Sequence, residues 1–403
     1  MEHLKQYPDE FIKPLVLSLD IMSRLNVYLY TTCSPFRKSD WRFFLLIPLM
    51  LIHYMAMILY TIRIFKEGTT VPELAFSLSV FFILIQAFLK ATIVIPKKDH
   101  IAQLIHGLGK NWRNVNLNER QIKKKDSDLK KIKLLLTVFY WGSMTASWQI
   151  MLTPAILELM KFCIGQGFQY VLPFGYVCFF DPVQNEFLYI GVYAFQVYTM
   201  LKVVYIYTGT EILMVTLCAL LSIEFAMLRE DFCHVIPKRG IHFGPNEDGT
   251  HSVEELIQKH QMLLELAYQL DHIFNRVVFV DLLFVTVVMC FFGFGITVAR
   301  GIFDVINNFI AVLTLLLPIL ILSYYGEQQK EESAGIADSV YHSNWYCGNA
   351  SYQKILLFVM KRAQKPCCLT SLKHAPITLH TFSKVVSTTW SYFSLITSVY
   401  GKD

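Results

Sequence analysis

Residues 376–400 read PITLHTFSKVVSTTWSYFSLITSVY and decide the fold of this chain. The segment is long enough to cross a bilayer, because a spanning helix needs about 20 residues. It nevertheless carries His380, Lys384 and many Ser and Thr hydroxyls. A helix surrounded by hydrocarbon does not tolerate such polarity, whereas a helix that faces protein or water does. The segment therefore predicts a membrane helix that lines a wet path.

The rest of the chain alternates between apolar runs and charged blocks. Hydrophobic residues make up 54% of its 403 residues, and the mean hydropathy is +0.42. Charged residues make up 17%, against about 25% in typical globular domains. This pattern is typical of a polytopic helical membrane protein and excludes a soluble enzyme. Met1–Asp20 is charged and has no apolar core of a cleavable signal peptide, so we expect the first spanning helix to act as the insertion signal.

Seven apolar runs predict seven spanning helices. They cover about residues 43–62, 74–95, 134–157, 187–209, 277–299, 305–326 and 376–400. Hydropathy alone would count Thr210–Ile223 as an eighth span. Because Glu211 and Glu224 flank that run, we interpret it as the fourth helix continuing out of the membrane.

Lysine and arginine are distributed unequally between the two sides of these spans. Residues 1–42, 96–133, 229–276 and 323–377 together hold 28 of them, whereas the opposite loops hold four. The positive-inside rule then places the amino terminus in the cytoplasm and the carboxyl terminus outside the cell. The predicted fold class is an all-α membrane protein with seven transmembrane helices in this inverted topology. A G-protein-coupled receptor would have the opposite one.

Apolar residues also recur at helical spacing outside the spans. Phe11–Tyr30 predicts an amphipathic helix at the cytoplasmic interface, ended by Pro35. Glu254–Arg276 has the same pattern and is expected to join a cytoplasmic helical bundle. The predicted divisions are a cytoplasmic amino-terminal segment (1–42), six spanning helices with a ligand-binding bundle (43–326), cytoplasmic anchor helices between subunits (327–375), and a final helix with an extracellular tail (376–403).

Other chemistry has little support in the sequence. Nine cysteines include no C-x-x-C pair, and neither a metal site nor a cofactor is expected. Cys163 and Cys178 share one predicted outer loop, where they form either a disulfide or two free thiols. Catalytic and phosphate-binding motifs are missing, and nucleic acid is not an expected partner. Asp281 lies within a span and is expected to pair with Arg276 or Lys202.

Short motifs in the carboxyl-terminal quarter resemble those of the insect odorant receptors. They are Tyr324–Gln328, Glu332-Ser333, Ala337-Asp338 with Tyr341, Trp345-Tyr346, Arg362–Pro366 and Ser391–Phe393. The resemblance implies a subunit of a ligand-gated, non-selective cation channel that detects volatile organic molecules. It also implies a heterotetramer with an olfactory co-receptor, in the plasma membrane of olfactory neuron dendrites. The chain lacks the co-receptor's long insertion between the fourth and fifth helices, which favours a ligand-tuning subunit.

Two other classes of membrane protein are alternatives to this one. A gustatory-type receptor channel for soluble tastants is the alternative within the same superfamily, and the Tyr324–Gln328 and Arg362–Pro366 motifs favour the odorant class. A transporter would show inverted repeats with broken helices, which the sequence does not.

Candidate pore residues follow one stripe of the last helix. At helical spacing the stripe is mostly polar, and the resemblance implies an apolar constriction at Leu395 and Val399. The alternative is that these two side chains pack against a neighbouring helix. The candidate pore residues are Thr388, Ser391, Leu395, Ser398 and Val399. The expected subunit interface contains Tyr346, Arg362, Lys365 and Pro366.

Candidate ligand-binding residues are aromatic, aliphatic, thioether and a few polar side chains in the outer halves of helices two, three, four and six. Small apolar ligands favour such a lining. For each residue, packing or lipid contact is the alternative. The candidates are Phe76, Val80, Phe81, Met144, Ser147, Trp148, Met151, Tyr189, Tyr193, Gln196, Phe309 and Leu313.

Overall fold

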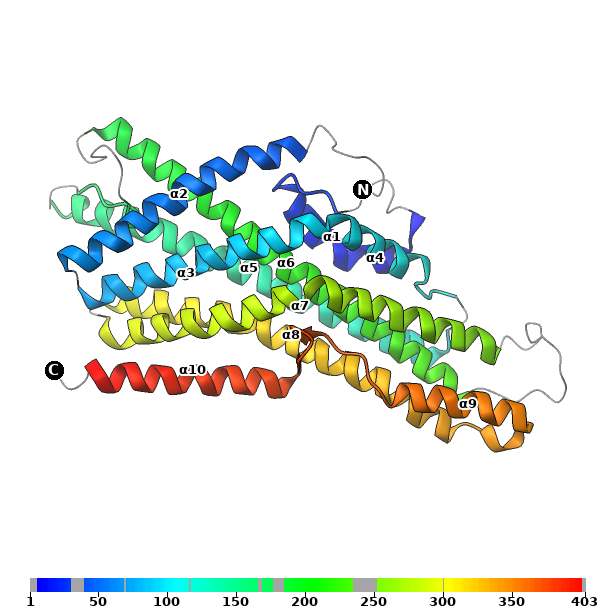
Figure 1. Cartoon of the computed structure of the whole chain (residues 1–403). Coiled ribbons are helices and arrows are strands. Elements are labelled where there is room, and N and C mark those ends of the chain that lie inside the picture. Colours follow the sequence, from blue (N-terminus) through cyan, green and yellow to red (C-terminus); the bar gives the residue numbers. More distant parts are fainter. Residues whose placement is uncertain are drawn as a thin grey trace.

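The protein is an elongated bundle of long helices, seen here in a computed structural model (Figure 1). The structure describes residues 6–29, 40–68, 70–115, 117–165, 169–176, 185–234, 252–299 and 301–400, without the side chains of 40–46 and 400. Its elements are α1 (Asp9–Ser23), α2 (Asp40–Glu67), α3 (Val71–Val94), η2 (Ile95–Lys97), α4 (Lys98–Lys110), α5 (Glu119–Cys163), α6 (Glu186–Cys233), α7 (Val253–Val298), α8 (Ile302–His342), η4 (Trp345–Cys347), α9 (Ala350–Ala363), β1 (Thr370–Ser371), β2 (Ala375–Pro376) and α10 (Leu379–Tyr400).

Each predicted span falls within one of these helices, apart from at most three residues at an end. Among the described residues, five helical stretches are long and apolar enough to cross a membrane: Ile47–Glu67, Val71–Lys110, Glu186–Cys233, Val253–Val298 and Ile302–His342. The predicted spans in α5 and α10 do not reach that hydropathy. In α10 the reason is the run of hydroxyls with His380 and Lys384, although its 22 residues are long enough to span.

The helix α6 forms the centre of the bundle. Its residues from Ile206 to Leu228 are all buried, because α1, α3, α5, α7 and α8 pack around it. This confirms the prediction that Thr210–Ile223 continues the fourth helix. The run is apolar because it lies in a protein core, so its hydropathy alone is no sign of an eighth span.

The amino-terminal helix α1 buries its apolar face in the same core. Phe11, Leu15 and Leu19 are almost completely buried, and α1 packs against α6. At Gly209 of α6, an added Cβ would lie only 3.0 Å from the side chain of Ile21, so the two helices approach closely. The amphipathic pattern thus predicts a helix correctly, but its apolar face packs on protein. Tyr30 and Pro35, at its predicted end, lie outside the described residues.

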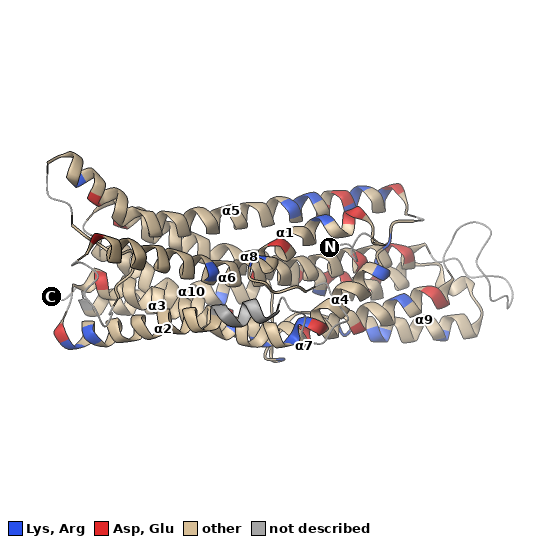
Figure 2. Ribbon diagram, turned by 90° about the horizontal axis from the view of Figure 1, so that it is seen from above, with Lys and Arg blue, Asp and Glu red and all other residues tan. Residues whose placement is uncertain are grey.

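The helices α5, α6, α7 and α8 are 41 to 48 residues long and extend far beyond the predicted spans. A capping box begins α7, where the Ser252 hydroxyl accepts from the Glu255 amide at 3.3 Å. Figure 2 shows that Lys and Arg gather over the half of the molecule that contains α4, α9 and the first part of α5. Between this half and the end that holds the C-terminus, a stretch of the ribbon is almost free of charge, as a hydrocarbon layer requires.

The connection into α10 is held by residues of the Tyr324–Gln328 motif. An added Cβ at Gly326 would lie 2.4 Å from the backbone carbonyl oxygen of Ile377, so only glycine admits this approach. The carboxylate of Glu327 accepts from the Leu379 amide at 3.3 Å, at the first residue of α10. The antiparallel pair β1–β2 precedes this point and contacts α7. From there α10 runs alongside α7 and α8 (Figure 1).

Candidate functional site

A small apolar cavity lies where five long helices meet. Its volume is about 90 Å³, which is below the roughly 300–1,000 Å³ of typical ligand pockets. Most of its wall is aliphatic or aromatic. The lining residues are Ile83 of α3, Ser143, Ala146, Ser147 and Ile150 of α5, Val203, Val204, Tyr207 and Thr208 of α6, Phe292 of α7, and Ala311, Thr314 and Leu315 of α8. The cavity therefore suits a compact, mainly apolar molecule.

The hydroxyls that line the cavity fall into two groups. Ser147 donates to the Ser143 carbonyl at 2.7 Å and Thr314 donates to the Ile310 carbonyl at 2.8 Å, so their protons are used within their own helices. The hydroxyls of Ser143, Tyr207 and Thr208 make no hydrogen bond within the described residues, and all three are buried. Three residues of the lining thus carry unpaired hydroxyls, and the oxygen of each is enclosed by protein atoms.

A buried ion cluster lies directly beside Tyr207. Lys90 of α3 contacts Asp281 of α7 at 2.5 Å and also pairs with Glu211 of α6. Gln86 donates to the Asp281 carboxylate at 3.0 Å, and the Lys90 ammonium lies 4.1 Å from the centre of the Tyr207 ring. The cluster joins three helices at the end of the predicted spans.

The expectation that Asp281 pairs with Arg276 or Lys202 is wrong, because Lys90 occupies that place. The ammonium of Lys202 instead donates to the Arg24 carbonyl at 2.9 Å. The whole of α4, α5 and α6 lies between Lys90 and Asp281 in the sequence, so neither spacing nor periodicity could indicate the pair.

Several predicted ligand-binding residues lie near the loop 169–176, at the other end of the predicted spans. The rings of Phe76 and Phe174 stack with their centroids 6.4 Å apart. Gln196 accepts from the Phe174 amide at 3.3 Å and donates to its carbonyl at 3.1 Å. These contacts hold the loop in the end of the bundle, where the His53 ring also packs against Phe174.

Three more predicted residues support the same region through backbone contacts. The Tyr189 hydroxyl donates to the Val171 carbonyl at 2.8 Å. The Tyr193 hydroxyl donates to the Met151 carbonyl at 2.6 Å, which joins α6 to α5.

The remaining candidates are dispersed. Ser147 lines the small cavity, whereas Met144 and Trp148 line a groove of about 520 Å³ along α5. Val80 is buried, and the Phe81 ring packs edge-on against Phe82. The side chains of Phe309 and Leu313 are 53% and 50% exposed and do not line the cavity. Ser143, Tyr207 and Thr208 are not among the predicted residues, because a hydroxyl within an apolar run is their only signal in the sequence.

The helix α10 is packed on one side only. Val385 and Thr389 are buried, and the Cys290 thiol of α7 contacts the Thr389 carbonyl at 3.6 Å. The opposite side is exposed, with Leu395 and Val399 each at 61%. The predicted pore residues Thr388, Ser391, Leu395, Ser398 and Val399 are all exposed. The structure therefore places them together on the uncovered side of α10.

The predicted interface residues lie at the other end of the molecule. Tyr346 is 64% exposed, Arg362 is exposed in the last turn of α9, and Lys365 and Pro366 are exposed just after it. On α9 itself, Leu357 and Phe358 are 63% and 72% exposed. This end presents apolar and cationic side chains next to one another.

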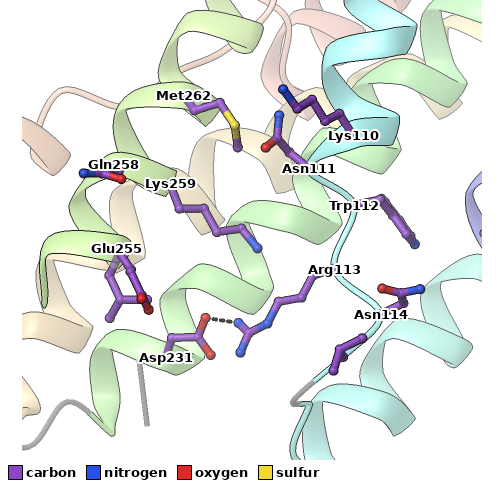
Figure 3. A pocket seen from close by; sticks show the side chains of 12 residues that line it. Lys110, Asn111, Trp112, Arg113, Asn114, Asp231, Glu255, Gln258, Lys259 and Met262 are labelled. Atoms are coloured by element: carbon purple, nitrogen blue, oxygen red, sulfur yellow. Dashed lines mark hydrogen bonds and ion pairs between the residues drawn. The ribbon is translucent and has the colours of Figure 1, made fainter. Parts of the chain in front are cut away.

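A larger pocket of about 530 Å³ opens between the end of α4 and the start of α7 (Figure 3). Figure 3 shows Arg113 and Lys259 directed into it, with Arg113 paired to Asp231. Lys259 pairs with Glu224 at 3.0 Å. Burial lowers the pKa of the Arg113 guanidinium, and the charge of Glu224 opposes that shift. Because Arg113 and Lys259 are each paired with a carboxylate, we interpret this pocket as part of the polar framework of the bundle.

Cys163 is exposed at the end of α5, whereas Cys178 lies outside the described residues. The disulfide prediction for this pair is therefore not tested. Within the described residues, no group of three or more His, Cys, Asp and Glu side chains could hold a metal ion.

Comparison with known proteins decides the family. The family model described as 7tm Odorant receptor matches residues 70–390. The chain belongs to this family. The resemblance inferred from its motifs is thereby confirmed, and so is the expectation that the chain is no enzyme.

Odorant receptor relatives from Drosophila melanogaster are only distantly similar. Odorant receptor 67c is 22% identical over 331 residues, which cover 80% of this chain and 78% of the relative. Odorant receptor 85f is 21% identical over 262 residues, 65% of each chain. The relative named odorant receptor 92a is 25% identical over 275 residues, which cover 67% of this chain and 66% of the relative. The chain thus spans slightly less than two thirds of the length of the relatives 85f and 92a.

Solved structures show the same fold. The insect olfactory receptor OR5 from Machilis hrabei in complex with eugenol matches with a TM-score of 0.80 at 11% identity, over 97% of this chain and 100% of that one. A second structure of OR5 gives a TM-score of 0.79 at 12% identity over the same shares. This odorant receptor family member is therefore a multi-pass membrane protein with the seven-helix fold.

Proposed function

We propose that this chain is a ligand-tuning odorant receptor subunit of a non-selective cation channel, opened by small volatile organic molecules together with a co-receptor. The observation that carries the proposal is the family match over residues 70–390. We place the protein in the plasma membrane of olfactory neuron dendrites, with the amino terminus in the cytoplasm. The charge asymmetry of its loops supports that orientation.

The small cavity supports the ligand part of this proposal. It lies between α3, α5, α6, α7 and α8, and its mostly apolar lining fits a volatile molecule. The aromatic groups around Phe76 and Phe174 lie nearer the loop 169–176 and lengthen the apolar region along the bundle. We propose that the predicted ligand residues of this region lie along the route into the cavity.

The uncovered side of α10 supports the channel part. Four such helices around an axis would present Thr388, Ser391 and Ser398 to the pore. The apolar side chains of Leu395 and Val399 would form a constriction that closes by dewetting. We propose that Tyr346, Arg362, Lys365 and Pro366 join subunits at the cytoplasmic end, because aromatic and Arg side chains are favoured at interface centres.

Recording currents over an odorant panel, with and without the co-receptor, tests this function. We expect ligand-gated current only when both subunits are present at the cell surface. Robust responses from the chain alone would refute the dependence on the co-receptor. Failure of every odorant to open a surface-expressed pair would refute the receptor function itself.

Orientation is tested separately. An epitope placed after Asp403 should bind antibody in intact cells, and one at the amino terminus only after permeabilisation. The reverse result would overturn the inverted topology.

A further inference from the structure

The uncovered side of α10 carries a positive charge as well as hydroxyls. Lys384 is exposed in the second turn of this helix. Lys384, Ser391 and Ser398 recur every seven residues, so they share one line of the helix surface. The packed side, which contains the buried Val385 and Thr389, lies against α7 and α8. The lysine therefore extends the row of predicted pore residues toward the start of α10.

The ammonium of Lys384 makes no ion pair or hydrogen bond within the described residues. The carboxylate at the start of α10, that of Glu327, pairs with Lys330 at 3.3 Å and accepts from the Leu379 amide. A lysine in a spanning helix faces protein or a water-filled space, because hydrocarbon disfavours its charge. Hydroxyls follow Lys384 on its line of the helix, which indicates that this line faces water.

Lys384 lies well away from the proposed constriction. It precedes Leu395 by eleven residues, which is roughly 16 Å along a helix. In the proposed topology this end of α10 is the cytoplasmic one, so the ammonium lies at the inner mouth of the pore. A charge at that distance acts on the ions that pass and leaves the constriction itself unchanged.

We propose that Lys384 sets the ion selectivity of the channel by holding a fixed positive charge at its cytoplasmic mouth. This charge disfavours divalent cations such as Ca²⁺ more than monovalent cations such as Na⁺. The inference rests on the proposed channel function, because it places the uncovered side of α10 against the pore.

Coulomb's law gives the size of the effect. A unit charge about 8 Å away across water lowers the local concentration of a monovalent cation about twofold and that of a divalent cation about fivefold. Salt screens part of this effect, and the apolar walls of a pore strengthen it. Lys384 therefore lowers the permeability of Ca²⁺ relative to Na⁺ by about twofold.

The test measures this permeability ratio in cells that express the full-length chain with the co-receptor. The reversal potential of the odorant-gated current, recorded in Na⁺ and then in Ca²⁺, gives the ratio. Lys384→Gln removes the charge and should raise the ratio about twofold. Lys384→Glu reverses the charge and should raise it about fourfold. The odorant concentration that gives half of the maximal current should stay the same, because the constriction is not altered.

Two control variants separate charge from structure. Lys384→Arg keeps the charge and should leave the permeability ratio unchanged. Lys66→Gln removes the charge of an exposed lysine at the end of α2 and should also leave it unchanged. A purely structural role of Lys384 would instead give the same result in its Gln, Glu and Arg variants.

Contact of this position with water is measured without any current. In the assembled channel, Lys384→Cys should react with a membrane-impermeant maleimide applied from the cytoplasmic side. Val385→Cys, which is buried against the neighbouring helices, should not. The unsubstituted chain gives the background from its own cysteines. A thiol that faces hydrocarbon would react only at background level, because the reactive thiolate forms in water.

An unchanged permeability ratio in Lys384→Gln and Lys384→Glu, with normal odorant-gated current, would overturn the inference and leave the receptor function standing. An equal shift in Lys384→Arg, or background labelling of Lys384→Cys, would also overturn it. Absence of current from the unsubstituted pair at the cell surface would refute the channel function and the inference together.

Discussion

Removal of the Lys90 ammonium is the sharpest test of how this membrane bundle is held together. In Lys90→Met the cation disappears, and the carboxylates of Glu211 and Asp281 remain buried without it. Removing one partner of a buried ion pair costs about 3–5 kcal/mol, because the other charge is left uncompensated. Since Lys90 and Asp281 are almost fully buried, water does not screen this loss.

The expected shift in melting temperature follows from the size of the chain. An unfolding entropy of about 2.1 cal/mol/K per residue gives roughly 0.85 kcal/mol/K for 403 residues. A loss of 3–5 kcal/mol then lowers the melting temperature by about 4–6 °C if the chain unfolds as one unit. The assay is thermal unfolding of the purified protein in detergent, with surface expression as a second measurement.

Two further variants show whether charge is the cause. Lys66→Met removes an exposed lysine at the end of α2 and should leave the melting temperature unchanged. Combining Lys90→Met with Glu211→Gln and Asp281→Asn removes all three charges and should recover most of the loss. If Lys90→Met alone melts like the wild type, the cluster does not stabilise the bundle and the reasoning is refuted.

Two other changes test the connection to α10 and its uncovered side. Gly326→Ala should lower the free energy of unfolding by about 1–3 kcal/mol, because its Cβ would overlap the Ile377 carbonyl and displace the start of α10. Gly142→Ala is the control, because an added Cβ there has no atom nearby. Equal melting temperatures of the two variants would contradict this reasoning. Leu395→Ala should raise the basal current of the channel severalfold by widening the constriction, whereas Leu320→Ala, a 40% exposed leucine of α8, should not. Unchanged leak and gating in surface-expressed Leu395→Ala would argue against the ring.

The sequence by itself determined the spans, the continuation of α6 through Thr210–Ile223, and the polar stripe of the last helix. These features depend on hydropathy and on helical spacing, which are properties of neighbouring residues. The motifs of the carboxyl-terminal quarter were also sufficient to identify the family. Gly326 and Glu327 of the Tyr324–Gln328 motif have roles at the start of α10 that only the packed structure reveals.

Only the tertiary structure decided which polar groups meet. Asp281 pairs with Lys90 because α3 and α7 pack side by side, and no local pattern encodes that choice. The same holds for the cavity, where one helical hydroxyl, that of Thr314, donates to its own backbone and another, that of Thr208, does not. Whether a buried group finds a partner depends on the positions of several helices at once, whereas the apolar composition of a run is enough to predict that the run is removed from water.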